Sequence, residues 1–235
     1  MKMLVCILFF TIICMVEARA QATMESVYEI RHAFDFYRHN QSQTEMMNPF
    51  HSVAEINGSP YLNDEFINGK VYTTSKTQFV DIPLRLNIYN DQVEFRNAEG
   101  KVYAIATPEI IELIEFGEYL IEYLPFQRGN KSSTGYFLVL EKGEASLYSK
   151  LKITLEQPKR AGGYQEAQPA RFIERPATYF VKIGTEPAKE IAKKKDIEEV
   201  FGAKNEKIIE YINSGKIKPN DEDALKELVK YYNSL

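Results

Sequence analysis

The feature that most limits how this chain can fold is a period of two in its apolar residues. In the segment Ile82–Tyr89, aliphatic side chains hold every second position, and the positions between them are mostly polar. Successive side chains of a β-strand point to opposite faces, so this alternation predicts a strand with one buried face. Pro83 has no backbone N–H to donate to a neighbouring strand, and its position therefore predicts an edge or a bulge.

Similar segments recur along the chain, separated by turn residues such as Asn90, Asp91 and Gly117. We expect further strands at residues 70–74, 93–95, 101–106, 110–116, 118–126, 135–141, 145–148, 151–155 and 179–183. Short strands joined by turns are typical of an antiparallel meander. We therefore predict an α+β, β-dominated fold, whose meander of about eight to ten strands curls into a half-barrel or a sandwich.

Three segments do not share this pattern. Residues 21–60 contain apolar residues without a clean period, so they fit strand or helix equally. Residues 157–171 are rich in Pro, Gly, Gln and charged residues, which predicts an exposed loop. Residues 188–193 fit either a returning strand or the start of a helix.

The tail from residue 194 has the apolar spacing of three short helices. The second helix is expected to end at Gly215, which suits a left-handed cap, and the third to begin at a cap formed by Asn220 or Asp221. Apolar residues of the third helix recur at i, i+3, i+4 and i+7, at Leu225, Leu228, Val229 and Tyr232. These stripes are narrow, so we expect the helices to pack on the β-rich body or on a partner.

The first twenty residues have the three parts of a secretory signal peptide. Lys2 precedes the apolar run Leu4–Val16, and the small residues Ala18 and Ala20 follow it. The run has 13 residues, whereas a membrane-spanning helix needs about 20. We therefore predict cleavage after Ala20, which leaves Gln21 as the first residue of the mature chain.

Cleavage after Ala22 is the near alternative. Lipid attachment is not expected, because Cys14 is not preceded by small residues and Cys6 lies too early. Both cysteines lie in the segment that would be removed, so a mature chain would have no disulfide, no thiolate metal site and no cysteine nucleophile. The chain is then expected to comprise a signal peptide (1–20), a β-rich body (21–193) and a helical segment packed on that body (194–235).

The charge of the chain argues against some partners. Processing at residue 20 removes two cationic side chains and one anionic side chain, so the formal net charge of −4 becomes −5. Nucleic-acid binding needs a basic face, and we expect no nucleic-acid partner. The sequence after residue 20 has no second apolar run of spanning length, so we expect no transmembrane segment after processing.

Several phrases of the sequence together resemble a known group of proteins. They are Gly58–Tyr72, Ile82–Phe95, Gly135–Glu156 and the closing helical segments DIEEVFG, IIEYINSGKIK and LKELVKYYN. This set is similar to uncharacterised exported proteins of Bacteroidota, over most of the mature chain. The similarity rests on turn and strand phrasing, and it implies a periplasmic or secreted setting in a Gram-negative envelope without implying a biochemical role.

The histidines are the first candidates for chemistry. All three, His32, His39 and His51, lie in one window of the sequence. Their spacings match neither the i, i+4 helical pair of zinc hydrolases nor another common set of metal ligands. We therefore interpret them as separate surface residues, with metal binding as the weaker alternative, and we expect no cofactor.

The adjacent carboxylates Asp64 and Glu65 are the second candidates, because paired carboxylates near an aromatic residue are typical of glycosidases. On a strand, however, neighbouring side chains point to opposite faces and would not converge on one bond. In a turn, Asn63 and Asp64 would instead form hydrogen bonds to the backbone. The chain has neither a G-x-S-x-G motif nor a phosphate-binding loop with its lysine.

Aromatic residues are the third candidates, since the chain has 15 Tyr and 14 Phe but no Trp. Tyr119, Tyr123 and Phe126 recur along one expected strand, as half-buried wall residues or as a surface that binds a protein or a glycan. We therefore expect a non-catalytic exported envelope protein that binds a protein or a glycan. The alternatives are a periplasmic hydrolase with Asp/Glu chemistry and a carrier of an apolar ligand.

Overall fold

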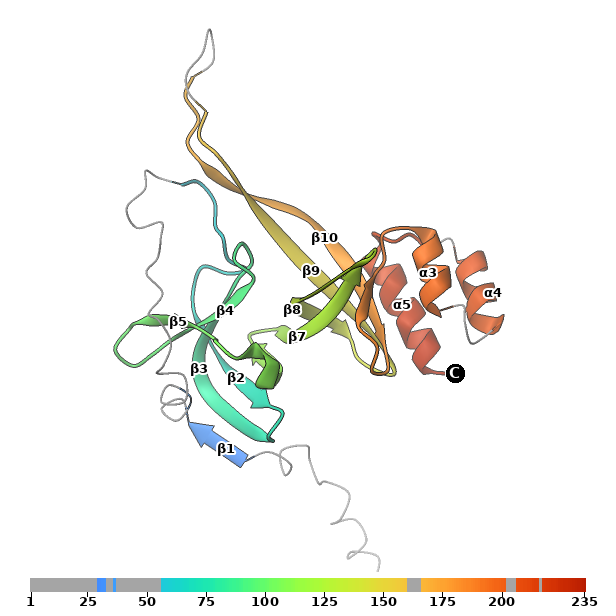
Figure 1. The fold of residues 1–235 in the computed structure, drawn as a ribbon, viewed down its shortest axis with the longest axis horizontal. Coiled ribbons are helices and arrows are strands. Elements are labelled where there is room, and N and C mark those ends of the chain that lie inside the picture. Colours follow the sequence, from blue (N-terminus) through green and yellow to red (C-terminus); the bar gives the residue numbers. More distant parts are fainter. Residues whose placement is uncertain (1–28, 33–35, 37–55, 160–165, 202–205, 216) are drawn as a thin grey trace, which may run out of the picture.

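The computed structural model of this chain describes residues 29–32, 36, 56–159, 166–201, 206–215 and 217–235. In this part of the chain a large mixed β-sheet dominates, and three helices follow it at the C-terminal end (Figure 1). The predicted fold class, a β-dominated α+β fold with a C-terminal three-helix appendage, is therefore confirmed.

The sheet is built from hairpin-connected neighbours. Its strands are β1 (Glu29–His32), β2 (Ile67–Thr73), β3 (Thr77–Asn87), β4 (Gln92–Arg96), β5 (Val102–Ala104), β6 (Ile111–Phe116), β7 (Tyr119–Arg128), β8 (Lys131–Glu141), β9 (Ala145–Glu156), β10 (Arg171–Ile183) and β11 (Ala188–Glu190). They lie in the order β11-β10-β9-β8-β7-β6-β2-β3-β4-β5, and β1 pairs with β3. From β6 to β10 each strand pairs antiparallel with the next, whereas β1–β3 and β11–β7 are parallel pairs.

The strand that the alternation predicted most clearly is β3. Ile82, Leu84 and Leu86 on this strand are buried in a core shared with β2, β4 and β6. The register between β2 and β3 shifts between Gly69 and Val71, and on β3 this irregularity falls between Phe79 and Ile82. Ile82 thus separates the irregularity from Pro83, which itself pairs with Asn68.

The strands β7, β8, β9, β10 and β11 form a closed ring of hydrogen-bonded neighbours, because β11 pairs with both β10 and β7. Aromatic side chains fill its interior. The Phe137 and Phe180 rings lie 5.0 Å apart, and Phe126 lies 5.3 Å from each of them, all edge to face. Aromatic rings prefer this arrangement to a face-to-face sandwich. The interior of the ring is therefore a packed core.

A partly buried ion pair joins the first half of the sheet to the ring. The Asp91 side chain, on the turn after β3, accepts a hydrogen bond from Lys150 Nζ of β9 at 2.6 Å, and the same Nζ donates to the Tyr136 carbonyl of β8 at 2.8 Å. Gly135 leaves the space for this contact, because a Cβ there would lie within 2.6 Å of Lys150 Nζ. Burial lowers the pKa of Lys150, and the Asp91 carboxylate acts in the opposite direction.

The helices are α3 (Lys194–Phe201), α4 (Glu206–Ser214) and α5 (Glu222–Asn233). Their apolar residues, including Leu225, Leu228 and Val229 of the predicted stripe, share a core with strand residues of β9 and β10. The Asp221 side chain caps α5 by accepting a hydrogen bond from the Ala224 N–H. Of the two expected packing surfaces, the β-rich body and a partner, the described residues show the helices on the body.

The long β9–β10 hairpin contains more strand than expected. A strand was expected only at residues 179–183, but β10 begins at Arg171 and pairs with β9 as far as Glu156. The described residues between the two strands, 157–159 and 166–170, lie outside regular strands, as expected of a loop, apart from a bridge between Lys159 and Gln168. The outer part of this hairpin projects away from the body (Figure 1). The ambiguous segment at 188–193 contains the short strand β11.

Candidate functional site

The predicted carboxylate pair lies on a segment of bends before β2. Asp64 and Glu65 are both exposed. The Ser59 hydroxyl donates a hydrogen bond to the Asp64 side chain, and the Asn63 side-chain amide donates to the Glu65 carbonyl. The two carboxylates therefore belong to a hydrogen-bonded bend on the surface of the molecule.

A buried charged cluster lies under this bend and ties it to the sheet. Arg85 Nη2 lies 2.7 Å from the buried Glu94 carboxylate, and the Asn87 side-chain amide donates to the same carboxylate at 2.8 Å. The Arg85 guanidinium also donates to the Asp64 carbonyl and lies 3.5 Å from the centre of the Tyr61 ring. Arg85 and Glu94 thus form an ion pair through Nη2, while Arg85 Nε has no hydrogen-bond partner among the described residues, and we assign this cluster a structural role.

The structure places the histidine candidates only in part. His32 lies on β1, where its backbone pairs with Val80 of β3. His39 and His51 lie outside the described residues, as do Ala20 and Gln21 of the predicted cleavage site. The described residues contain no group of three or more His, Cys, Asp or Glu side chains placed to hold a metal ion. Within the same residues, the helices are too short or too polar to cross a membrane.

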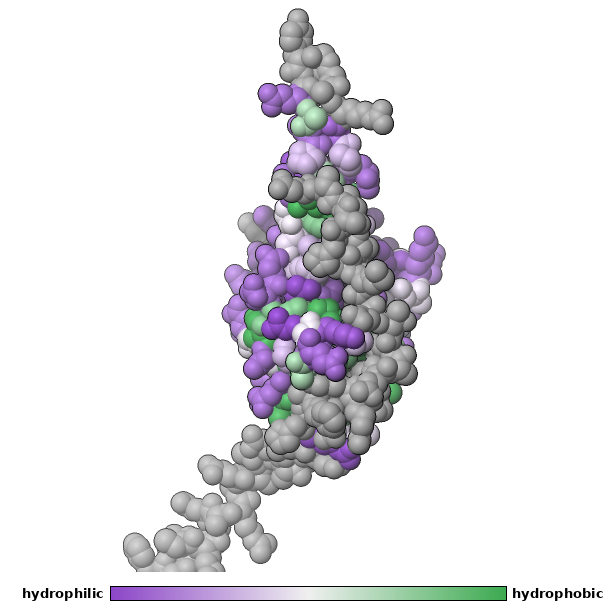
Figure 2. Space-filling view, turned by 90° about the vertical axis from the view of Figure 1, so that its left-hand side faces the viewer, coloured by the Kyte–Doolittle hydropathy of each residue, from purple (hydrophilic) through white to green (hydrophobic). Residues whose placement is uncertain are grey.

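The three aromatic candidates on β7 do not share one face. Tyr119 and Tyr123 pack against the core of the first half of the sheet, whereas Phe126 points into the ring. The Tyr123 ring lies 4.9 Å from that of Tyr136, and its hydroxyl is 2.7 Å from the Thr134 hydroxyl. On the face shown in Figure 2, hydrophobic side chains form small separate areas among hydrophilic ones. The aromatic residues of β7 are therefore divided between two cores.

A groove at the other end of the molecule has the size of a ligand site. It has a volume of about 440 Å³ and lies between the β10–β11 turn and the helices α3 and α5. Ligand sites usually have about 300–1,000 Å³. Its lining residues are Glu144, Val181, Ile183, Gly184, Thr185, Glu186, Pro187, Lys189, Glu199, Val200, Phe201 and Tyr232. A second hollow, beside Phe36 and Phe79, has only about 240 Å³.

The apolar part of the groove comes from three elements. Val181 belongs to β10, Val200 and Phe201 to α3, and Tyr232 to α5. The Phe201 and Tyr232 rings lie 5.6 Å apart, edge to face. Burial raises the pKa of Tyr232, and the nearby Glu144 carboxylate raises it further. The groove therefore combines a well-packed apolar surface with a negative electrostatic field from a nearby carboxylate.

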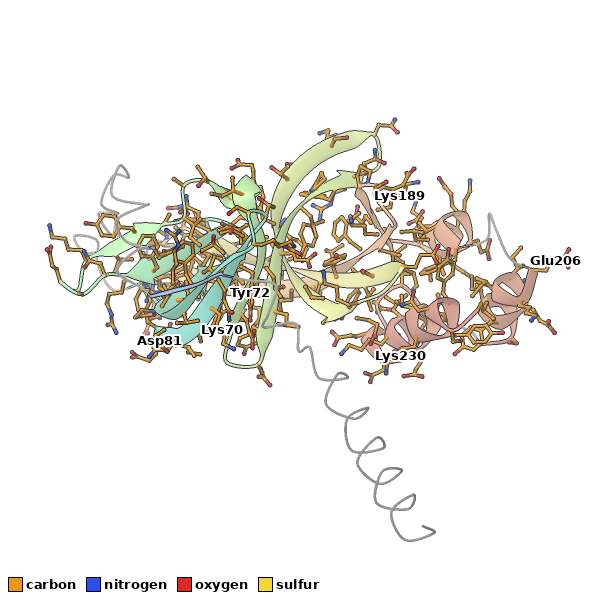
Figure 3. The ribbon with its side chains drawn as sticks, turned by 90° about the horizontal axis from the view of Figure 1, so that it is seen from below. Lys70, Tyr72, Asp81, Lys189, Glu206 and Lys230 are labelled. Atoms are coloured by element: carbon orange, nitrogen blue, oxygen red, sulfur yellow. The ribbon has the colours of Figure 1, made fainter. Side chains whose placement is uncertain are left out.

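The charged rim of the groove is mainly acidic. Glu144, Glu186 and Glu199 are exposed carboxylates on two turns and on α3. Lys189 is the one basic residue of the lining, and its Nζ lies 4.0 Å from the Glu186 carboxylate. Figure 3 shows Lys189 near the helical end of the molecule. Among the described residues, Glu144 and Glu199 form no ion pair, so the rim has a negative balance.

The backbone holds the two acidic turns together. The Gly184 N–H donates to the Glu144 carbonyl at 2.9 Å, which fixes the β10–β11 turn beside the β8–β9 turn. Gly184 has a φ of 57°, in the left-handed region that glycine adopts easily. Gly184 and Pro187 are residue types typical of turns, but nothing in the sequence indicates that this turn meets α3. The groove residues were therefore missed at the sequence level.

No protein-family model, no curated protein and no solved structure matches this chain. The resemblance to exported proteins of Bacteroidota stays a prediction.

Proposed function

We propose that this protein is exported to the periplasm or secreted, and that it is a non-catalytic envelope protein that holds a segment of a partner protein in the groove. The observation that carries the proposal is the groove itself, which has about 440 Å³ between the β10–β11 turn and two helices. Its apolar surface is formed by the half-buried Ile183, Val200 and Tyr232, which pack against the core that the helices share with β9 and β10. Binding would thus need little reordering of the protein.

The two alternative functions have less support. A hydrolase would need acid and base groups that converge on one bond, but the hydroxyl of Ser59 engages Asp64, and Arg85 and Asn87 engage Glu94. A carrier of an apolar ligand would need an empty interior, but Phe126, Phe137 and Phe180 fill the ring.

Site-specific photocrosslinking tests the binding role. A photoreactive phenylalanine at Thr185, in the groove, is expected to form an adduct with one envelope protein, whereas the same group at the exposed Ser132 of β8 is not. A Val200→Phe change, which fills part of the groove, is expected to abolish the adduct without unfolding the protein. Equal adducts at both positions, or an adduct that persists with Val200→Phe, would show that the groove is not the binding site.

Export has a separate test. Mass spectrometry of the protein from the envelope fraction is expected to find a chain that begins at Gln21, or at Thr23 if cleavage follows Ala22. A cytosolic protein with an intact N-terminus would contradict the proposed location and leave the groove hypothesis unaffected.

A further inference from the structure

We infer that the groove binds an extended protein segment that presents Lys or Arg side chains next to aliphatic ones. This inference rests on the proposed function and specifies the chemistry of the partner. It follows from the way the lining residues combine charge and apolar surface.

The charges of the groove lining favour a cationic partner. The lining holds three carboxylates, those of Glu144, Glu186 and Glu199, and one ammonium group, that of Lys189. Lys189 lies beside Glu186, which leaves two carboxylates without a cation among the described residues. Lys182, which adjoins the turn, donates to the Gly184 carbonyl at 2.9 Å. A cationic partner would supply the missing positive charge, and an anionic one would be repelled.

The carboxylates of the groove lie beside its apolar surface. The half-buried Tyr232 is the aromatic side chain at this surface, with the buried Phe201 packed against it, and Glu144 and Glu199 lie on the same lining. Lys and Arg have apolar stems and charged ends, so one such side chain can cover an aromatic surface while its cation reaches a carboxylate. A cation can also lie over the face of a tyrosine ring. One residue type thus satisfies both parts of the groove.

A neutral glycan fits the groove lining less well than a cationic protein segment. Sugars bind through stacking on aromatic rings and hydrogen bonds to polar groups, and Tyr232 could supply part of such a site. A neutral sugar would, however, leave the charge of Glu144 and Glu199 without compensation. The acidic rim therefore favours a cationic protein segment.

Blocked synthetic peptides test this chemistry directly. Fluorescently labelled hexapeptides Leu-Lys-Leu-Lys-Leu-Lys and Leu-Gln-Leu-Gln-Leu-Gln are titrated into the full mature chain and followed by anisotropy. Ion pairs at exposed sites contribute about 0.2–1 kcal/mol each, so the cationic peptide is expected to bind about tenfold more tightly than the neutral peptide. This preference should fall at 1 M salt, where the screening length is about 3 Å.

Two matched double variants locate the interaction. Glu144→Gln with Glu199→Gln is expected to remove most of the tenfold preference. Glu118→Gln with Glu174→Gln changes the net charge equally at exposed positions outside the groove and is expected to leave the preference intact. All four carboxylates are exposed, so both proteins should keep the wild-type unfolding midpoint.

The outcomes separate this inference from the proposed function. Equal binding of both peptides, equal effects of the two double variants, or tighter binding of a neutral oligosaccharide such as chitotetraose would overturn the cationic preference. If one of these results is found and the crosslink through Thr185 persists, the groove still binds a partner protein but does not prefer a cationic one. If the crosslink and the peptide preference are both absent, the proposed function and this inference are both overturned.

Discussion

Two tyrosines of the ring strands offer a sharp test of the structure, because they are almost equally buried and differ in their hydroxyl groups. Tyr136 is 5% exposed and Tyr148 is 2% exposed. The Tyr148 hydroxyl donates to the Glu122 carboxylate at 2.8 Å. Among the described residues, the buried Tyr136 hydroxyl has no hydrogen-bond partner. Phenylalanine at each position would retain the ring and remove only the hydroxyl.

The two substitutions are expected to change stability in opposite directions. A hydrogen bond to a charged group contributes about 1.5–3 kcal/mol, so Tyr148→Phe should lower the free energy of unfolding by about this amount. A buried polar group without a partner costs about 1–3 kcal/mol, so Tyr136→Phe should raise the free energy of unfolding by about 1 kcal/mol. The contact of the ring of residue 136 with Tyr123, at 4.9 Å, would be retained.

Urea unfolding at pH 7, followed by circular dichroism, measures both changes. The denaturant slope should stay constant, because neither substitution changes the surface exposed on unfolding. A loss of more than about 1 kcal/mol for Tyr136→Phe would mean that its hydroxyl has a partner in the native protein and would refute the reasoning.

The stability of the wild-type protein is expected to depend more strongly on alkaline pH than that of Tyr136→Phe. Burial, aided by the Asp91 carboxylate, raises the pKa of Tyr136 well above its usual value. A group whose pKa is raised by folding contributes its full stability below its unfolded pKa, about 10 for tyrosine, and loses it as the pH rises further. Wild-type protein should therefore lose stability above pH 10 more steeply than Tyr136→Phe. Parallel curves from pH 9 to 11 would contradict the burial of this hydroxyl.

Three further predictions are each tested by urea unfolding. Phe137→Ala should lower the free energy of unfolding by about 3–5 kcal/mol, because it opens a cavity in the ring. Leu120→Ala on the surface should lower it by less than about 0.5 kcal/mol. Similar losses for the two variants would contradict a packed ring. Asp221→Ala should cost about 1 kcal/mol by removing the cap of α5, and no loss would exclude that cap. Gly69→Ala should lower the free energy of unfolding by about 3 kcal/mol, because its Cβ would overlap a backbone carbonyl. Gly135→Ala should lower it less, because its Cβ meets the ends of flexible side chains. A larger loss for Gly135→Ala than for Gly69→Ala would refute this geometry.

The sequence predicted the strands that have one buried face. In β3 the side chains of Ile82, Leu84 and Leu86 are buried, and the residues between them are half-buried, so the alternation follows directly from the packing. The outer part of the β9–β10 hairpin has no such contrast, because much of it is exposed on both sides. There, Arg171 and Arg175 pair with Glu156 across the strands, and this polar composition resembles a loop.

The aromatic candidates show what strand parity could have added. Tyr123 lies four positions after Tyr119, and both share a face of β7. Phe126 lies three positions after Tyr123, an odd number, and is therefore on the other face. This division was available from spacing alone. The carboxylates of the groove were not, because Glu144 and Glu199 are distant in sequence and meet only through tertiary packing.

The closure of the ring explains why the groove lies where it does. β11 has only three residues, and its pairing places Ala188 beside Phe126 of β7. To reach β7, the chain must reverse immediately after β10, which places the turn at residues 184–187 at the end of the ring. α3 then begins at Lys194, so the same short connection brings α3 against that turn. Ring closure and groove formation are thus consequences of one chain reversal, and a change that separates β11 from β7 should also open the groove.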